Sequence, residues 1–327
     1  MSPVPRTEAA LWQPGASLDM LRLRAQLVAR TRGFFETRGV LEVDTPLLAR
    51  AGSTDPAIES FSVDDGEQTL WLQTSPEAFM KRLLAAGSGA IFQLARAFRT
   101  GELGTRHNPE FLLLEWYRPG FSLRELMQEV EDLVRELLAG HARLASAHCL
   151  AWADWFREGT GLDPWHSDAA TLRAFCGAHL DHLPALDPED LDAWRDLIVS
   201  HWLEPRLPPG LCFIYDYPAS QAALARIRPG DPPLAERFEL YLDGVELANG
   251  FHELADAAEQ RQRFQAEQRR RRERDQAPVP ADEHLLAALA SGLPDCCGVA
   301  LGFDRLLMRV AAVVRLDQVM PFAFDRV

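Results

Sequence analysis

The sequence predicts an α+β fold in which an antiparallel β-sheet is flanked by helices. Two observations support this class: several predicted strands are joined by short turns, and the predicted helices occur in separate runs instead of alternating with each strand. The chain has 327 residues, of which 47% are hydrophobic, so it can bury a substantial core. Because no linker divides it, we expect a single domain over residues 1–327.

The first half of the chain is expected to begin with a long helix. Ser17 is a suitable N-cap for a helix over residues 18–38, which Gly39 would end. A short strand over residues 40–46 follows and closes at Pro46. The next predicted elements are a helix over residues 76–86, strands over 90–98 and 111–117, and a helix from the Ser122 cap to residue 144.

The second half is predicted to contain a β-hairpin between two helical regions. Residues 150–210 are expected to form helical pieces interrupted by Pro and Gly, and a strand over residues 211–219 follows them. Asp243-Gly244 is a two-residue turn between strands that start at Phe238 and resume at Val245. The remaining elements are a helix over residues 253–276, a strand over 296–303 and a helix over 304–314.

This hairpin carries carboxylates on one face. With the two-residue turn, Tyr241 lies opposite Glu246, on the face that also carries Glu239, and the chain then continues to Glu253. Carboxylates do not bind phosphates directly, so Glu246 and Glu253 are explained if Mg²⁺ bridges them to a polyphosphate. The alternative is that Glu246 faces solvent and that Glu253 stabilises the start of a helix.

The strand over residues 111–117 has one face suited to a ligand. By the two-residue period, Phe111, Glu115 and Tyr117 share this face. The opposite face, expected in the core, carries Leu112, Leu114 and Trp116. Phe111 offers a flat surface for a heterocycle, and Glu115 and Tyr117 can hold an ammonium group. Arg99 ends the preceding strand, where it can meet a phosphate, and His107 adds a donor from the loop. The alternative is a surface hairpin with scattered charges.

The last predicted strand contains two glycines, Gly298 and Gly302. Glycine weakens a strand unless another group approaches its backbone closely. Arg305 follows in the first turn of the next helix, near the end that attracts anions. This pattern favours an anion site, although small residues in a buried strand also serve helix packing.

Composition excludes several classes of function. The net charge of −14 argues against strong nucleic-acid binding, and no run of about eighteen apolar residues predicts a membrane span. The N-terminus lacks the pattern of a signal peptide, and five cysteines without framework spacing indicate reduced thiols, so we expect a cytoplasmic protein. Arg269–Arg272 are interpreted as a solvated helix face that pairs with neighbouring acids, with a docking surface for an acidic partner as the alternative.

Together these stretches resemble the three signature motifs of class II aminoacyl-tRNA synthetases. The first motif resembles the long helix and the strand that ends at Pro46, which implies a homodimer, because this motif builds the dimer interface in that family. The second resembles the segment from Phe98-Arg99 to His107-Asn108-Pro109-Glu110-Phe111, and the third resembles the strand leading to Arg305. The segments SPE at 75–77 and ELANGFHEL at 246–254 are similar to lysyl-tRNA synthetase in particular.

The short segment before the first-motif helix narrows the resemblance to one branch of the lysyl-tRNA synthetase-like proteins. Because the first-motif helix starts at about residue 18, we expect no N-terminal anticodon-binding domain. This architecture resembles the truncated lysyl-tRNA synthetase paralogues that ligate (R)-β-lysine to a lysine of elongation factor P. The resemblance implies an ATP-dependent ligase that forms AMP and pyrophosphate and uses Mg²⁺. Ala300 points to the same branch, because lysyl-tRNA synthetases have Gly at that position.

The resemblance also implies roles for individual residues. Arg99, Glu246, Glu253 and Arg305 are expected to carry catalysis, and Glu246 and Glu253 to hold Mg²⁺. Residues expected to bind ATP are Arg99, Thr100, Gly101, Glu102, His107, Asn108, Phe111, Glu246, Leu247, Gly302 and Arg305. Residues expected to bind the amino acid are Ser75, Pro76, Glu77, Glu115, Tyr117, Asn249, Glu253 and Ala300.

One position departs from the family pattern. The family usually has Glu two residues after the motif-two Arg, whereas this chain has Gly101 there, followed by Glu102. Two alternative functions are considered: a minimal lysyl-tRNA synthetase-like enzyme that charges tRNA, and a non-catalytic regulatory protein with the same fold. The acidic charge argues against the first, and the intact Arg99, Glu246, Glu253 and Arg305 argue against the second.

Overall fold

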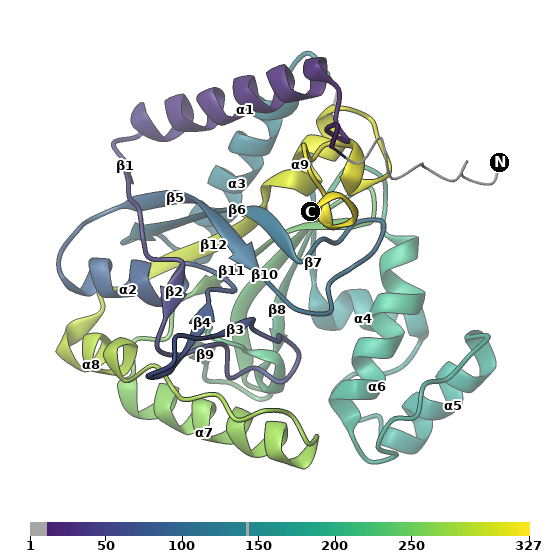
Figure 1. Ribbon diagram of the computed structural model, residues 1–327. Coiled ribbons are helices and arrows are strands. Elements are labelled where there is room, and N and C mark those ends of the chain that lie inside the picture. Colours follow the sequence, from purple (N-terminus) through teal and green to yellow (C-terminus); the bar gives the residue numbers. More distant parts are fainter. Residues whose placement is uncertain (1–11, 142–143) are drawn as a thin grey trace.

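The computed structural model describes residues 12–141 and 144–327, and its main feature is a mixed, mostly antiparallel sheet (Figure 1). The strand order is β1-β5-β6-β12-β11-β10-β8-β7, and β9 pairs with β10. These strands are β1 (Leu41–Glu42), β5 (Ile91–Phe98), β6 (Glu110–Pro119), β7 (His148–Ala151), β8 (Leu211–Pro218), β9 (Ile227–Arg228), β10 (Leu234–Leu242), β11 (Val245–His252) and β12 (Cys296–Gly302). The predicted α+β class with an antiparallel sheet is confirmed at the centre of the sheet, whereas β1 and β7 pair in parallel with β5 and β8.

Helices cover both faces of this sheet (Figure 1). They are α1 (Leu18–Glu36), α2 (Glu77–Ala85), α3 (Leu123–Leu138), α4 (Trp152–Thr160), α5 (Ala169–His179), α6 (Leu191–Ile198), α7 (Ala257–Glu273), α8 (Glu283–Gly292) and α9 (Phe303–Val310). A small second sheet has the order β2-β4-β3, from strands β2 (Leu48–Ala49), β3 (Ser62–Asp64) and β4 (Thr69–Leu72). Within the described ranges, no helix is both long and apolar enough to cross a membrane.

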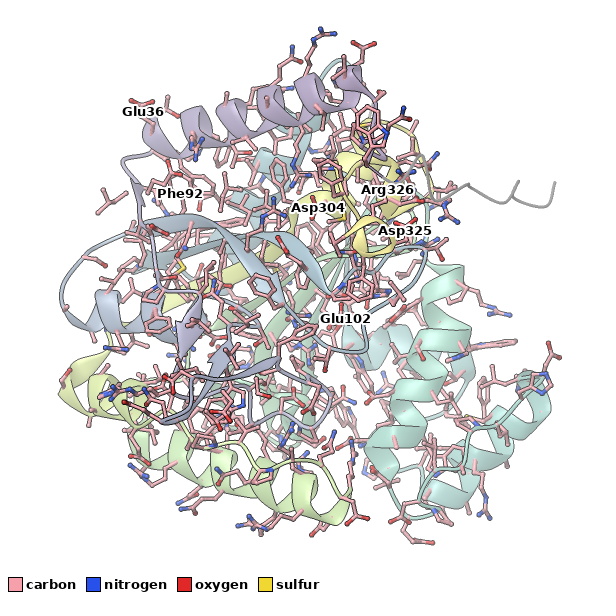
Figure 2. The ribbon with its side chains drawn as sticks, in the orientation of Figure 1. Glu36, Phe92, Glu102, Asp304, Asp325 and Arg326 are labelled. Atoms are coloured by element: carbon pink, nitrogen blue, oxygen red, sulfur yellow. The ribbon has the colours of Figure 1, made fainter. Side chains whose placement is uncertain are left out.

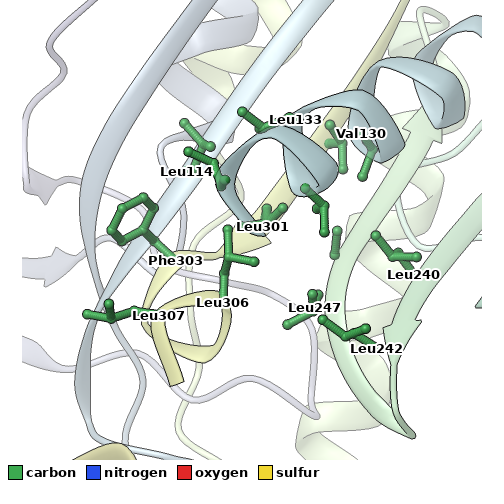
Figure 3. Close-up of a cluster of buried hydrophobic side chains, with 14 of the residues drawn as sticks. Leu114, Val130, Leu133, Leu240, Leu242, Leu247, Leu301, Phe303, Leu306 and Leu307 are labelled. Carbon is green, nitrogen blue, oxygen red and sulfur yellow. The ribbon is translucent and has the colours of Figure 1, made fainter. Parts of the chain in front are cut away.

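The largest core lies between the sheet and helices α1, α3 and α9. Figure 3 shows the inward face of the central strands, with Leu114, Leu240, Leu247 and Leu301 packed against side chains such as Val130 of α3. Leu114 and Trp116 are fully buried, which confirms the predicted core face of β6. A second cluster joins α4–α6 to β8 and β10, and a third lies between α2, α7, α8 and the opposite face of the sheet.

Most helix boundaries agree with the sequence prediction near their caps. Ser17 accepts a hydrogen bond from Met20 N, and Ser122 forms a capping box with Glu125. Helix α3 ends at Leu138, earlier than predicted, and Ala142 and Arg143 lie outside the described residues. Helix α7 starts four residues later than predicted, α9 ends at Val310 instead of residue 314, and β1 contains only two residues of the strand expected over 40–46.

The interpretation of Arg269–Arg272 as an entirely solvated face is wrong at one position. Arg269, Arg270 and Arg272 are exposed, but Arg271 is buried and pairs with Glu59, which lies far away in the sequence. A helix on a protein surface turns every third or fourth residue towards the protein interior. Among four consecutive arginines, one is therefore expected to face inward. The run therefore has both a solvent side and a buried contact.

The hairpin of β10 and β11 contains a β-bulge that the sequence prediction missed. The turn is as predicted: Asp243 and Gly244 both have positive φ, and Tyr241 pairs with Glu246. The next pair is Leu240 with Ala248, so one extra residue, Leu247, is inserted into β11. The bulge changes the alternation, so Glu246 and Asn249 both line the cavity. Leu247 and Ala248 are both part of the core cluster, and Leu247 also reaches the cavity.

Candidate active site

A cavity of about 500 Å³ lies on the sheet face opposite the main core. Its walls come from the β5–β6 hairpin, β11, the β12–α9 junction and the irregular segment before β3. Of the residues predicted from the sequence, Ser75, Glu77, Arg99, Glu102, His107, Asn108, Phe111, Glu246, Leu247, Asn249, Ala300, Gly302 and Arg305 line it. It is not lined directly by Pro76, Thr100, Gly101, Glu115, Tyr117 or Glu253.

One end of the cavity is cationic. Arg305 donates to the Glu246 carbonyl (3.0 Å) and carboxylate (3.2 Å), and its other terminal nitrogen lies 2.8 Å from His107 Nε2. Burial and then the positive charge of Arg305 lower the pKa of His107, so the neutral ring accepts this hydrogen bond at Nε2. Arg99 lies 5.1 Å from the ring centre of Phe111. This end therefore offers two guanidinium groups and an aromatic face, which suit a nucleotide phosphate and base.

The other end of the cavity is acidic, and a buried ammonium group lies behind its wall. Lys81 of α2 is 1% exposed and contacts the carboxylates of Glu77 and Glu253 at 2.6 Å each. Burial alone would lower the pKa of Lys81, but the charges of Glu253 and Glu77 hold it above its ordinary value. The charge thus stays on Lys81, and Glu253 is committed to a partner that the sequence analysis did not identify.

Glu115 adds a third carboxylate to this end. Ser75 Oγ donates to one of its oxygens (2.7 Å) and Tyr117 Oη to the other (2.6 Å). Burial and the nearby charge of Glu77 raise the pKa of Glu115 to about 7, while these two hydrogen bonds oppose the shift. Burial likewise raises the pKa of Glu253, to about 8, so the empty site keeps part of its acid protonated near neutral pH. Three carboxyl groups beside one ammonium group can therefore ionise further when a ligand brings its own amino groups, which suits a ligand carrying more than one of them.

Residue pairing across the sheet places Ala300 at the centre of the acidic end. In β12, Ala300 pairs with Glu115 on one side and with Asn249 on the other. Two residues earlier, Gly298 has a structural reason to be glycine: a Cβ there would lie 2.3 Å from the Tyr117 ring and 2.5 Å from Glu253 Oε1. The close approach expected at a strand glycine is therefore made by the protein's own side chains at Gly298.

The two carboxylates predicted to hold Mg²⁺ do not converge. Glu246 is the second residue of β11 and Glu253 follows the last one, so at about 3.3 Å per residue they lie about 23 Å apart along the strand. The structure instead brings Glu239 of β10 near Glu246: burial and then the charge of Glu239 raise the pKa of Glu246, and Arg305 opposes this shift. Glu246 lies deep in the protein but faces the hollow, so 42% of its side chain is exposed.

These carboxylates fit a divalent cation only in part. Glu239 and Glu246 are neighbouring carboxylates near the cavity, and carboxylate oxygens are ligands that Mg²⁺ takes, with water and phosphate oxygens completing its coordination shell. Glu239, however, already accepts hydrogen bonds from Arg237 and Tyr241. Within residues 12–141 and 144–327, no group of three or more His, Cys, Asp or Glu side chains is arranged to hold a metal.

The loop between β5 and β6 carries the position that departs from the family pattern. Gly101 has φ of +76°, a conformation that favours glycine over a residue with a side chain. The next residue, Glu102 (labelled in Figure 2), lines the cavity. Its carboxylate lies 3.6 Å from the Arg99 guanidinium. Thr100 does not line the cavity, and its N–H donates to the Glu59 carbonyl (2.9 Å).

Asn108 uses both ends of its amide within the protein. Its Nδ2 donates to the Glu110 carbonyl (2.6 Å), and its Oδ1 accepts from the N–H of Phe324 (2.9 Å). Pro76 is the N-cap of α2 and directs Glu77 into the first turn of that helix. Both residues therefore shape the site through the backbone, and a direct ligand contact of either stays a prediction.

Three residues at the site were missed by the sequence analysis, namely Lys81, Arg237 and Asp304, and Glu239 was placed on the carboxylate face of the hairpin but given no role. Arg237 lines the cavity and bonds Asn249 Oδ1 (3.2 Å) as well as Glu239. Asp304, labelled in Figure 2, is buried at the cavity wall. It accepts hydrogen bonds from Arg24 of α1 and from Leu112 N of β6. The period of two along β10 puts Arg237 on the same face as Glu239, so this pattern could have indicated Arg237 from the sequence.

Comparison with known proteins shows the family of this chain. The family described as tRNA synthetases class II (D, K and N) matches residues 11–326. A Haemophilus influenzae (strain PittGG) protein named elongation factor P--(R)-beta-lysine ligase is 45% identical over 321 residues, covering 96% of this chain and 98% of the relative. A protein of the same name from Edwardsiella ictaluri is 46% identical over 329 residues, covering 98% of this chain and 99% of the relative. The chain therefore belongs to the class II tRNA synthetase family, in the branch that contains the elongation factor P--(R)-beta-lysine ligases.

Proposed function

We propose that this protein is an ATP-dependent ligase that attaches (R)-β-lysine to the ε-amine of a lysine on elongation factor P. The observation that carries the proposal is the division of one cavity into two ends. Arg99, Arg305 and Phe111 line an end suited to ATP. Glu77 lines the other end, next to the buried carboxyl groups of Glu115 and Glu253, and this acidic end suits a diamino acid. The names of the relatives supply the identity of the amino acid and of the acceptor protein.

The proposed reaction has two steps. A carboxylate oxygen of β-lysine attacks the α-phosphorus of ATP, the bond to the β-phosphate breaks, and pyrophosphate leaves. The ε-amine of the acceptor then attacks the carbonyl carbon of the adenylate, AMP leaves, and the nitrogen loses a proton as the amide forms. The protein supplies no covalent nucleophile, so its contribution is positioning and neutralisation of charge by Arg99 and Arg305.

Glu246, with Glu239 beside it, is the position we propose for Mg²⁺. A bound magnesium ion would neutralise phosphate charge and orient the triphosphate. Arg305 donates to the carbonyl and the carboxylate of Glu246, so the guanidinium and this acidic position are fixed relative to each other. The earlier expectation that Glu253 shares the ion is not retained, because Glu253 lies at the other end of β11 and pairs with Lys81.

We also propose that the chain works as a homodimer, as one catalytic domain, and in the cytoplasm. The family resemblance of α1 and β1 supports a dimer, and exposed apolar side chains near the C-terminus, including Phe322 and Phe324, support a contact there. All five cysteines are free thiols, which suits a reducing compartment.

The proposal is tested by the intact mass of elongation factor P after incubation with the protein, ATP, Mg²⁺ and (R)-β-lysine. We expect a gain of one lysyl unit that requires ATP. A parallel tube contains bulk tRNA in place of the factor. Charged tRNA without a mass gain on the factor would favour the minimal synthetase, and no product in either tube would contradict both enzymatic readings.

A further inference from the structure

One wall of the cavity is an irregular segment, residues 51–59, which we call the wall segment. It contains no helix or strand, yet Thr54, Asp55, Ala57 and Ile58 line the cavity. A segment without regular structure has backbone groups that need partners elsewhere, and its position depends on those partners.

The partners of the wall segment come from α7 and the turn after it. Glu267 accepts a hydrogen bond from Thr54 Oγ1, and Gln276 Nε2 donates to the Pro56 carbonyl (2.8 Å). Arg271 makes the largest set of contacts. It donates to the Asp55 carbonyl (3.2 Å) and, through its other terminal nitrogen, to both carboxylate oxygens of Glu59 (3.0 and 2.9 Å).

Arg271 is suited to this position by its shape and charge. It is 1% exposed, and its Nε also donates to the Ala277 carbonyl (3.1 Å), so all three of its nitrogens have partners. Only a guanidinium offers donors in this fork-shaped arrangement, and the ammonium of lysine does not reproduce it. Glu59 is partly exposed, so its ion pair with Arg271 contributes little energy through charge alone. Its main effect is to fix the orientation of the hydrogen bonds from the guanidinium.

A backbone hydrogen bond connects the wall segment to the cationic end of the cavity. The Glu59 carbonyl accepts from the N–H of Thr100 (2.9 Å), and Thr100 directly follows Arg99. A chain of contacts thus runs from Arg271 through Glu59 and Thr100 to the residue proposed to meet the phosphates. Neither Arg271 nor Glu59 lines the cavity.

We propose that Arg271 is a positioning residue, which fixes the wall segment against α7 and, through Glu59, the backbone beside Arg99. The inference rests on the proposed function only for the choice of substrates. A displacement of about 1 Å at a reacting group can reduce a rate about a hundredfold. We therefore expect Arg271→Ala to lower kcat/KM for adenylate formation by about this factor, with a raised KM for ATP.

The test compares Arg271→Ala and Arg271→Lys with Arg272→Ala, an exposed neighbour on the same helix. ATP–pyrophosphate exchange gives kcat and KM, and hydrogen exchange of the peptide over residues 51–61 reports the wall segment itself. We expect faster exchange in that peptide for both Arg271 variants, a larger kinetic loss for Ala than for Lys, and wild-type values for Arg272→Ala. Wild-type kinetics and protection in folded Arg271→Ala would overturn the proposal.

A second pair of variants guards against a global folding defect. Glu59→Gln keeps a hydrogen-bond acceptor for Arg271, and Glu59→Ala does not, while both leave the buried arginine in place. Glu59→Ala is expected to resemble Arg271→Ala, and the double variant to be no worse than either single one. Additive losses in the double variant would contradict the proposed chain of contacts. ATP affinity and hydrogen exchange can be measured without elongation factor P, so a failure of the acceptor assay would not obscure this result.

Discussion

At the scale of single residues, Ala300 is the position where the smallest change is expected to alter substrate choice. Its methyl group lies between Glu115 and Asn249 across three neighbouring strands. We predict that Ala300→Gly raises the activation of α-lysine relative to β-lysine about tenfold, since one methyl group in a pocket changes specificity by this order. ATP–pyrophosphate exchange with each amino acid measures the ratio, and an unchanged ratio would exclude Ala300 as a determinant.

Glu115 leads to a prediction about pH. Its pKa is raised to about 7, first by burial and then by Glu77, and its ionised form is the one that attracts an ammonium group. As pH falls through 7, Glu115 takes up a proton and that attraction is lost, so KM for the amino acid should rise between pH 8 and pH 6. Glu115→Gln should show a higher KM that varies less over this range; a parallel profile in both proteins would assign the titration elsewhere.

The same residue has an opposite effect on folding. A carboxyl group whose folded pKa is raised stabilises the protein at low pH, and this contribution is lost as pH rises through the folded value, here about 7. Substrate-binding strength and fold stability therefore change in opposite directions with pH at Glu115. The ionised Glu115 carboxylate that attracts the substrate's ammonium group therefore lowers the free energy of unfolding of the protein without substrate.

At the scale of elements, β12 allows a matched test of its two glycines. Gly298→Ala would bring a methyl group within 2.3 Å of the Tyr117 ring, whereas at Gly302 the nearest neighbours of an added methyl are carbons of Arg305 at 3.6–3.8 Å. We predict that Gly298→Ala lowers the free energy of unfolding by about 1–3 kcal/mol, as overpacking usually does. Gly302→Ala should leave it nearly unchanged. Denaturant unfolding of both variants measures the difference, and equal stabilities would contradict the contact at Tyr117.

The β10–β11 hairpin shows how far the sequence could predict an element. The turn at Asp243-Gly244 and the pairing of Tyr241 with Glu246 follow from local residue preferences, and both are confirmed. The bulge at Leu247 does not follow from the period of two, because it depends on how the whole strand packs between β10 and β12. Without it, Glu246 and Asn249 would point to opposite faces, and the cavity would lose one of them.

Long-range ion pairs were missed for a related reason. Lys81 in α2 and Glu253 after β11 are 172 positions apart, and Arg271 and Glu59 are 212 apart, so no local pattern links them. The sequence could identify Glu253 as a carboxylate in an unusual place, but its partner depends on the order of strands in the sheet. Side chains on one element were therefore predicted better than contacts between elements.

At the scale of the whole molecule, the surface near the C-terminus leads to a prediction about assembly. A second hollow, of about 420 Å³, is lined by Phe61, Leu72, Phe98 and Phe322, and Phe322 and Phe324 remain 49% and 51% exposed. Apolar surface of this kind on a soluble protein commonly marks a contact. We predict a dimer in sedimentation, shifted towards monomer by Phe322→Asp; a wild-type monomer at micromolar concentration would contradict this.

The buried Lys81 has a consequence for the chemistry of the enzyme towards itself. It is the only lysine among the chain's 34 lysine and arginine residues, and its ammonium is enclosed between two carboxylates. An acyl-adenylate that escapes from its site reacts with any accessible amine nearby, and the enzyme is the nearest protein. Apart from its α-amine, this chain offers no side-chain amine for that reaction. The intact mass of the enzyme should thus show no side-chain acylation during turnover without an acceptor, and the activated product is kept for other proteins.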